Sequence, residues 1–253
     1  ALLVPYAKLL GMKVVFTHHG PDYDRDKWGR IAKIILKLGE RIGCMFADDV
    51  IVISDVIRRL IAHKYNRTKK VHLIYNGVSE PDICDYPEYF QELGIEKGKY
   101  ILLSAHREEN IDTEKNFLNL MNAVNEMAKK YDMPILYSCH PRSRKFIEQR
   151  GFVFDERVIQ HQPLGFHDYN HLQMNAFAVV SDSGTLPEES SYFLSIGHPF
   201  PAVCIRTSTE RPEALDKGNF ILAGITTEQV LQAVDVAVEM NRDGALGIPV
   251  DDY

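Results

Sequence analysis

Short apolar runs alternate along the chain with longer amphipathic stretches. The apolar runs, rich in β-branched residues, predict strands at 13–17, 49–53, 71–75, 100–104, 134–138, 158–160, 178–181, 202–205 and 220–222. Apolar residues three and four positions apart predict helices at 1–11, 28–46, 55–65, 88–93, 113–130, 143–150, 167–175, 187–196 and 227–240. In the second helix, Ile31, Ile34, Ile35, Leu38 and Ile42 share one face. Strands that alternate with helices predict parallel sheets covered on both faces.

A linker at 81–87 divides this series into two parts. The fold class is therefore α/β, with two doubly wound, Rossmann-like lobes: residues 1–85 and residues 95–253. The first lobe has too few strands to be complete. The opening residues read as the end of an amphipathic helix closed by Gly11, so we expect the chain to begin inside a domain.

Composition narrows the function classes. The net charge of -6 and the lack of a Lys/Arg-rich run argue against nucleic-acid binding. No apolar run approaches the roughly 20 residues that span a bilayer. Four scattered cysteines favour a reduced, cytoplasmic protein. No Cys pair has metal-ligand spacing and no Gly-x-Gly-x-x-Gly motif occurs, so we expect neither a metal nor a redox cofactor.

The strongest candidate site is the segment 181–189, SDSGTLPEE, which follows an apolar strand and opens a helix. Ligands of parallel sheets bind at the carboxyl ends of strands, and the free N–H groups of a helix start attract anions. Ser183 and Gly184 suit a phosphate, and a glutamate early in the helix can accept hydrogen bonds from ribose. The alternative is an ordinary Ser or Asp N-cap with solvated glutamates.

Three further polar clusters follow strands. In RTSTERPE (206–213), Arg211 can grip a phosphate or pair with Glu210; the alternative is a solvated loop. SAHREEN (104–110) carries His106 and Arg107, and CHPR (139–142) carries His140. A single histidine is more often structural, but four polar clusters at successive strand ends predict one ligand crevice.

These motifs carry a family resemblance. SAHREEN, CHPRSR, SDSGTLPEESS and RTSTERPEALDKG, in this order, resemble the C-terminal lobe of the non-hydrolysing UDP-N-acetylglucosamine 2-epimerases. The segment HPFPAVCIRTSTERPEALDKGNFILAGI is most similar to the sequences of the UDP-N-acetyl-L-fucosamine synthase branch. The resemblance covers about Ile95–Tyr253 and implies a GT-B type fold. It also implies C2 epimerisation of a UDP-N-acetylhexosamine for capsule or O-antigen synthesis.

By this resemblance, Ser183 and Gly184 contact the diphosphate, Glu189 the ribose and Arg211 the phosphates, while His140 is the catalytic histidine. The full implied substrate-binding set is His106, Arg107, Ser183, Gly184, Glu189, Glu210 and Arg211. Family chemistry eliminates UDP to a glycal-like intermediate and adds it back after C2 is reprotonated on the other face. Relatives are commonly dimers through the N-terminal lobe, which here is replaced, so the oligomeric state stays open, with a homodimer as one candidate.

The N-terminal part resembles a different family. The epimerase patterns HGDT, VEAGLRT and PEE, which hold the family's carboxylates, are not found. Instead KVVFTHHGPDYDRDKWGRIAKIILKLGE, FADDVIVISDVI and IYNGV resemble the N-terminal lobe of family 4 glycosyltransferases of the rhamnosyltransferase-like kind. This places His18, His19 and Asp22 near a sugar; the alternative is a loop without catalytic duty. Three functions stay open: an epimerase, a retaining glycosyltransferase using a UDP- or dTDP-sugar, and a catalytically incomplete UDP-binding fragment.

Overall fold

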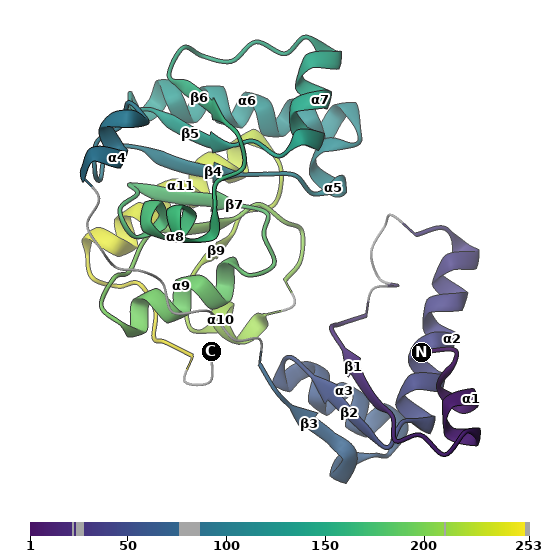
Figure 1. The fold of residues 1–253 in the computed structure, drawn as a ribbon. Coiled ribbons are helices and arrows are strands. Elements are labelled where there is room, and N and C mark those ends of the chain that lie inside the picture. The colour runs from purple at the N-terminus through teal and green to yellow at the C-terminus, as the bar shows by residue number, and fades with distance from the viewer. Residues whose placement is uncertain (22, 24–27, 76–86, 210, 251–253) are drawn as a thin grey trace. The chain divides into compact units, whose positions relative to one another are not determined.

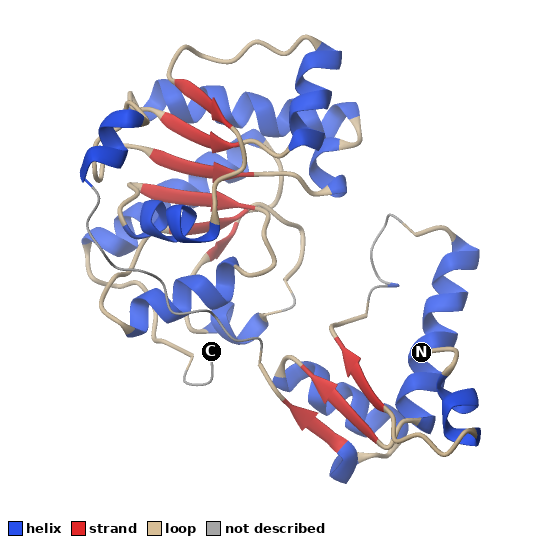
Figure 2. Cartoon of the chain, viewed as in Figure 1, coloured by secondary structure: helices blue, strands red, loops and turns tan. Residues whose placement is uncertain are grey.

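The structure, a computed structural model, describes residues 1–21, 23, 28–75, 87–209 and 211–250 (Figure 1). The chain divides into two compact units. Unit 1 comprises Ala1–Gly77 with Glu210–Glu213, and unit 2 comprises Val78–Thr209 with Ala214–Asp251. Each unit has a parallel sheet packed with helices (Figure 2), which confirms the predicted α/β class.

Unit 2 has six parallel strands in the order β6-β5-β4-β7-β8-β9. The strands are β4 (Ile101–Ser104), β5 (Ile135–Ser138), β6 (Val158–His161), β7 (Ala178–Ser181), β8 (Ala202–Cys204) and β9 (Ile221–Leu222). From β4 the chain adds strands in one direction as far as β6, then returns to β7 and adds strands in the other direction. The sheet is therefore doubly wound, and its strand order reverses between the neighbours β4 and β7.

Helices cover both faces of this sheet (Figure 1). They are α4 (Pro87–Glu92), α5 (Glu108–Ile111), α6 (Glu114–Tyr131), α7 (Pro141–Arg150), α8 (Phe166–Met174), α9 (Leu186–Ser195), α10 (Pro212–Asp216) and α11 (Thr227–Arg242). Successive strand residues point to opposite faces: Ile101 and Leu103 belong to the core under α6 and α11, and Leu102 to the core under α8 and α9. Burial on both faces explains why the strands are apolar throughout.

Unit 1 has three parallel strands in the order β1-β2-β3. Its elements are α1 (Val4–Leu9), β1 (Val15–His18), α2 (Arg30–Phe46), β2 (Asp49–Val52), α3 (Asp55–Tyr65), the 3₁₀ turn η2 (Thr68–Lys70) and β3 (Val71–Leu73). Val50 and Val52 of β2 pack with Ile57 and Ile61 of α3 in the core of this unit. Ser54 is the N-cap of α3, and its Oγ accepts the Ile57 N–H at 3.3 Å.

The apolar face of α2 does not lie in the core. Ile31, Ile34, Ile35 and Leu38 are 77%, 65%, 51% and 49% exposed. The buried residues of α2 are Gly39, Glu40, Gly43 and Cys44. The helix approaches β1 through small residues, since a Cβ on Gly43 would lie 2.9 Å from the Phe16 ring. The periodicity identified the helix, but close packing decided which face is buried.

Other differences from the prediction are local. Helix α7 begins at Pro141 rather than Ser143, and the short helices α5 and α10 were not predicted. The linker 81–86, Asp22 and Glu210 lie outside the described residues. Within the described ranges, no helix is both long enough and apolar enough to cross a membrane.

Candidate functional site

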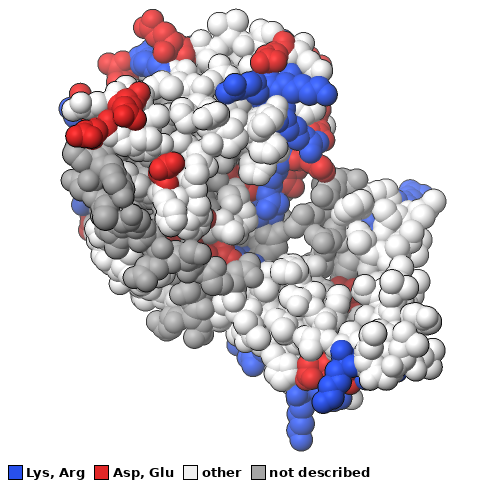
Figure 3. Space-filling model, in the orientation of Figure 1, with Lys and Arg blue, Asp and Glu red and all other residues white. Residues whose placement is uncertain are grey.

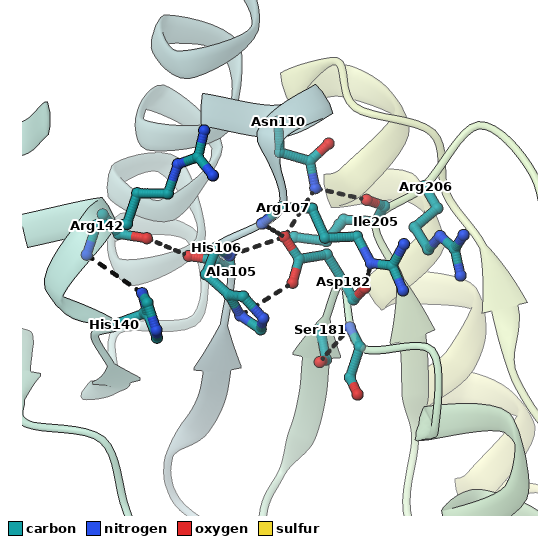
Figure 4. A network of polar contacts seen from close by, with 12 residues as sticks. Ala105, His106, Arg107, Asn110, His140, Arg142, Ser181, Asp182, Ile205 and Arg206 are labelled. Carbon is teal, nitrogen blue, oxygen red and sulfur yellow. Dashed lines mark hydrogen bonds and ion pairs between the residues drawn. The ribbon is translucent and has the colours of Figure 1, made fainter. Parts of the chain in front are cut away.

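The candidate site lies where the strand order of unit 2 reverses. The last residues of β4 and β7, Ser104 and Ser181, are paired in register. The loops that follow, 105–107 and 182–185, therefore leave the sheet side by side (Figure 4). Open α/β sheets bind ligands in the crevice that such a reversal creates at the carboxyl ends of the strands.

Asp182 joins the two loops. Its side chain is fully buried, and Oδ2 accepts the main-chain N–H groups of His106 at 2.8 Å and Arg107 at 2.7 Å (Figure 4). Asn110 Nδ2 donates to the same oxygen at 3.1 Å and to Ile205 O at 3.0 Å. These bonds tie the loop after β4 to the ends of β7 and β8, and they offset part of the cost of burying the carboxylate, whose Oδ1 has no hydrogen-bond partner among the described residues.

The main chain before His106 is fixed from the other side. Tyr137 OH and Ser143 Oγ donate to the Ala105 carbonyl at 2.9 and 2.7 Å. Burial raises the pKa of Tyr137, so its hydroxyl stays protonated and remains a donor. The position of His106 is therefore set by hydrogen bonds on both sides of its own peptide.

Two histidines meet at this crevice. His106 Nδ1 lies 3.5 Å from Asp182 Oδ1, and the His106 ring stacks on the His140 ring with centroids 5.3 Å apart. His140 is the N-cap of α7, and its Nδ1 accepts the Arg142 N–H at 3.2 Å. The structure thus brings the CHPR and SAHREEN motifs together, as the strand-end argument predicted. The catalytic role of His140 stays a prediction.

Two arginines converge on Gly184. A Cβ added to this glycine would lie 3.0 Å from Arg107 Nη2 and 4.0 Å from Arg206 Nη1. Arg107 is oriented by a bond from Nε to the Asp182 carbonyl at 2.6 Å, and Figure 4 shows its guanidinium near that of Arg206. Two guanidinium groups beside the half-buried backbone of Gly184 form a site suited to a diphosphate.

The helix start differs from the prediction. Helix α9 begins at Leu186, and its N-cap is Thr185, whose side chain makes no capping bond. The reading of Ser183 or Asp182 as an ordinary N-cap is therefore wrong. The Ser183 N–H donates to Ser181 Oγ at 3.0 Å, which holds the turn that presents Gly184.

Glu189 and Arg211 were also predicted to bind the nucleotide. Glu189 is half-buried and accepts from Thr185 Oγ1 at 2.7 Å and Gln173 Nε2 at 2.8 Å. Arg211 is buried and belongs to a segment that groups with unit 1. The ribose role of Glu189 and the phosphate role of Arg211 stay predictions.

Three residues of this site were not predicted: Asp182, Asn110 and Arg206. Asp182 was read only as a capping candidate, although its place between strand and turn is where a carboxylate can reach a neighbouring loop. Arg206 begins the same segment that contains Arg211 and lies two residues past the end of β8. Its position at a strand end was the signal that could have identified it.

The structure is that of a doubly wound α/β protein in which two arginines and two histidines gather at the point where the strand order reverses. Comparison with known families agrees with this class. The family model described as UDP-N-acetylglucosamine 2-epimerase matches residues 48–246, and that of Glycosyltransferase Family 4 matches residues 1–80. The chain belongs to the UDP-N-acetylglucosamine 2-epimerase family. The match begins well ahead of Ile95, where the resemblance was expected to start.

Similar sequences carry related names. A UDP-N-acetylglucosamine 2-epimerase of Methanococcus maripaludis is 35% identical over 148 residues, which are 57% of this chain and 39% of that protein. A UDP-2,3-diacetamido-2,3-dideoxy-D-glucuronate 2-epimerase of Pseudomonas aeruginosa is 28% identical over 149 residues, 58% of this chain and 40% of that protein. The matched region thus spans about two fifths of these relatives.

Solved structures share the fold. UDP-N-acetylglucosamine 2-epimerase from Rickettsia bellii has a TM-score of 0.69 at 25% identity, covering 94% of this chain and 62% of that one. UDP-GlcNAc 2-epimerase from Neisseria meningitidis bound to UDP-GlcNAc has a TM-score of 0.72 at 19% identity, covering 98% and 68%. These similarities confirm the predicted GT-B type of α/β fold.

Proposed function

We propose that this protein takes part in C2 epimerisation of a UDP-N-acetylhexosamine, with unit 2 binding the UDP. The observation that carries the proposal is the convergence of Arg107 and Arg206 on Gly184 at the strand reversal. Relatives in this family are named for 2-epimerisation of UDP-sugars, which supports the substrate class. The finer assignment, synthesis of UDP-N-acetyl-L-fucosamine for capsule or O-antigen, rests on the motif resemblance alone.

The crevice suits the departure and return of UDP. Elimination places negative charge on the leaving diphosphate, and two guanidinium groups beside Gly184 stabilise that charge. His106, His140, Ser183, Glu189 and Arg211 stay candidates for further contacts to the nucleotide and the sugar. The carboxylates that take and return the C2 proton belong to family patterns that this sequence does not contain. The roles that we propose for unit 2 are therefore to bind UDP and to stabilise it as the leaving group.

Calorimetry with UDP tests the binding site. Removing Arg107 or Arg206 by substitution with Ala deletes a charge-assisted hydrogen bond and should weaken binding by about 1.5–3 kcal/mol. Arg211→Ala tests the third arginine in the same assay. Arg157→Ala is the matched control, because Arg157 pairs with Asp155 and Asp132 just before β6, at the amino end of the sheet. If all of these variants bind UDP as tightly as the parent protein, the site is wrong.

Product analysis separates the three functions. An epimerase converts a UDP-N-acetylhexosamine into its C2 epimer, whereas a retaining glycosyltransferase forms a glycoside and free nucleotide. The family 4 glycosyltransferase match over residues 1–80 favours the second candidate. The missing carboxylate patterns favour the third candidate, a UDP-binding fragment, and turnover of any UDP-N-acetylhexosamine would exclude it.

We also propose a homodimer formed through unit 1. The exposed apolar face of α2 supports it, because exposed apolar patches of this kind usually mark an interface. In Figure 3 much of the surface over α1 and α2 is free of charged side chains. Light scattering should report a dimer that Ile34→Glu converts to a monomer, while Lys37→Glu on the same helix leaves it intact. A monomeric parent protein would exclude this assembly.

A cytoplasmic location stays part of the proposal. It is supported by three described cysteines, Cys44, Cys139 and Cys204, which are free thiols.

A further inference from the structure

We propose that Asp182 is a positioning residue that fixes the tautomer of His106 and couples ligand binding to proton uptake by that ring. The inference deepens the proposed function and rests on it for the identity of the ligand. Its basis is the fully buried Asp182 carboxylate: Oδ2 accepts three N–H groups, while Oδ1 makes no hydrogen bond with any described residue and lies 3.5 Å from His106 Nδ1.

The two carboxylate oxygens of Asp182 have different partners. Oδ2 accepts three N–H groups, from His106, Arg107 and Asn110, at 2.7–3.1 Å. Oδ1 has none of these donors and lies 3.5 Å from His106 Nδ1. Three donors on one oxygen fix the orientation of the carboxylate, so the second oxygen is held toward the ring.

This arrangement selects the tautomer of His106. A carboxylate oxygen only accepts hydrogen bonds, so it favours a proton on Nδ1 and leaves Nε2 as the second ring position. When an anionic ligand arrives, a proton on Nε2 creates an imidazolium between Asp182 and the ligand, stabilised from both sides. The proton comes from solvent, so binding is coupled to proton uptake.

His140 has the opposite environment. Its Nδ1 accepts the main-chain N–H of Arg142 at 3.2 Å, so the neutral ring carries its proton on Nε2. A second imidazolium would also repel that of His106 across the 5.3 Å stack. Three charged side chains lie on or beside the loops that carry the pair: Asp182, Arg107 and Arg142 (Figure 4). Asp182 Oδ1 lies 3.5 Å from His106 Nδ1, and the Arg142 guanidinium pairs with Glu108 and Asp112. The Asp182 carboxylate lies beside His106, which therefore takes the proton.

The tautomer of His106 is measurable in the ligand-free parent protein. Nitrogen-15 NMR of the imidazole distinguishes a proton on Nδ1 from one on Nε2, and the loss of a signal in His106→Ala assigns the residue. The expected result is neutral His106 with its proton on Nδ1. A proton on Nε2 in the parent protein would overturn the proposal, and this measurement does not depend on whether UDP binds.

Asp182→Asn gives the second measurement. The amide oxygen will take the Oδ2 place, where three N–H groups donate, so the NH₂ group will face His106 Nδ1 and force its proton onto Nε2. Affinity for UDP-N-acetylglucosamine should fall about tenfold or more, as for other carboxylates that orient a ligand-binding histidine. Proton uptake on binding, measured by calorimetry in two buffers of different ionisation enthalpy, should disappear.

Asn125→Ala is the control, because it removes an asparagine amide whose partners, the main chain of Val153 and of Asp155, are not part of the candidate site. It should keep the Nδ1–H tautomer and the proton uptake. If Asp182→Asn leaves the tautomer and the proton uptake unchanged, Asp182 only stabilises the loop. If the parent protein shows the expected tautomer but binds no UDP-sugar, the proposed function fails and the positioning of His106 stands.

Discussion

Each unit of the molecule buries a carboxylate beside the end of a parallel strand, but the two carboxylates accept hydrogen bonds from different kinds of group. Glu40 in unit 1 accepts from three side chains: His18 Nε2 at 3.0 Å, Lys64 Nζ at 2.6 Å and Tyr65 OH at 2.7 Å. Asp182 in unit 2 accepts mainly from the main chain of one loop. Glu40 links side chains of packed elements, so we expect it to stabilise unit 1. Asp182 orders a loop at the candidate site, so we expect it to affect ligand binding.

The largest expected effect concerns Glu40. Glu40→Gln removes the charge that Lys64 and His18 require and leaves buried polar groups without their partner, so unit 1 should lose about 3 kcal/mol of unfolding free energy. Urea unfolding followed by the fluorescence of Trp28, the single tryptophan and a residue of unit 1, measures this loss.

The control for Glu40 is an exposed carboxylate. Glu96→Gln removes the surface ion pair with Lys99 and should change stability by no more than about 0.5 kcal/mol. If Glu40→Gln weakens UDP binding and leaves the unfolding free energy of unit 1 unchanged, the stabilising role of Glu40 is wrong.

Acid should remove the contribution of Glu40. Burial acts to raise the pKa of Glu40, but hydrogen bonds from His18, Lys64 and Tyr65 outweigh it and lower the pKa from 4.5 to about 2. Because the unfolded chain then binds the proton first, the stabilisation is present above about pH 4.5 and is lost as the pH falls toward 2. The stability difference between the parent protein and Glu40→Gln should be constant from neutral pH to about pH 5 and shrink below it. A difference that grows on acidification would contradict this sign.

In unit 2, a substitution at the candidate site, Gly184→Ala, should alter ligand affinity and leave the unfolding free energy unchanged. The methyl group of Gly184→Ala would lie 3.0 Å from Arg107 Nη2, so the guanidinium must shift from its present position beside Gly184. We expect UDP affinity to fall about tenfold, the size of one lost interaction of roughly 1.4 kcal/mol. Calorimetry measures the affinity, and Gly29→Ala, at a glycine with open space around it, is the control. Unchanged affinity in Gly184→Ala would remove Arg107 from the site.

The smallest expected effects test whether the units unfold separately. Ser54 caps α3 in unit 1 and Thr113 caps α6 in unit 2, each by accepting a main-chain N–H. Replacing either residue with Ala should cost about 1 kcal/mol. Hydrogen exchange measured peptide by peptide should show the loss of protection in the unit that carries the substitution. Equal loss in both units would mean that they unfold as one.

The fold of unit 2 was largely predictable because its strands are apolar on both faces and alternate with helices. β7 occurs at the predicted residues, Ala178–Ser181, and the other strands agree within a residue or two. Short polar helices were not predictable in the same way. Helix α5, Glu108–Ile111, has four residues and no apolar period, and its place is set by bonds such as Arg142 to Glu108.

The sequence predicted where in the fold the candidate site lies, but it identified only some of the residues that form it. Clusters at strand ends located His106, Arg107, Ser183 and Gly184. The role of Asp182 was not predictable, because its partners are 75 and 76 positions away and only the strand pairing brings them together. Similarly, periodicity placed the apolar residues of α2 on one face without showing that the glycines would form the packed one.

The Ala105 carbonyl accepts two hydrogen bonds, and this has a consequence for the rate at which a ligand binds. Because Tyr137 and Ser143 both donate to this oxygen, the loop that carries His106 and Arg107 is ordered before any ligand is present. Binding then involves little loss of chain entropy, and association is governed by diffusion and by attraction between the arginines and the anion. The association rate constant should therefore decrease as salt screens that attraction, while the dissociation rate constant changes less.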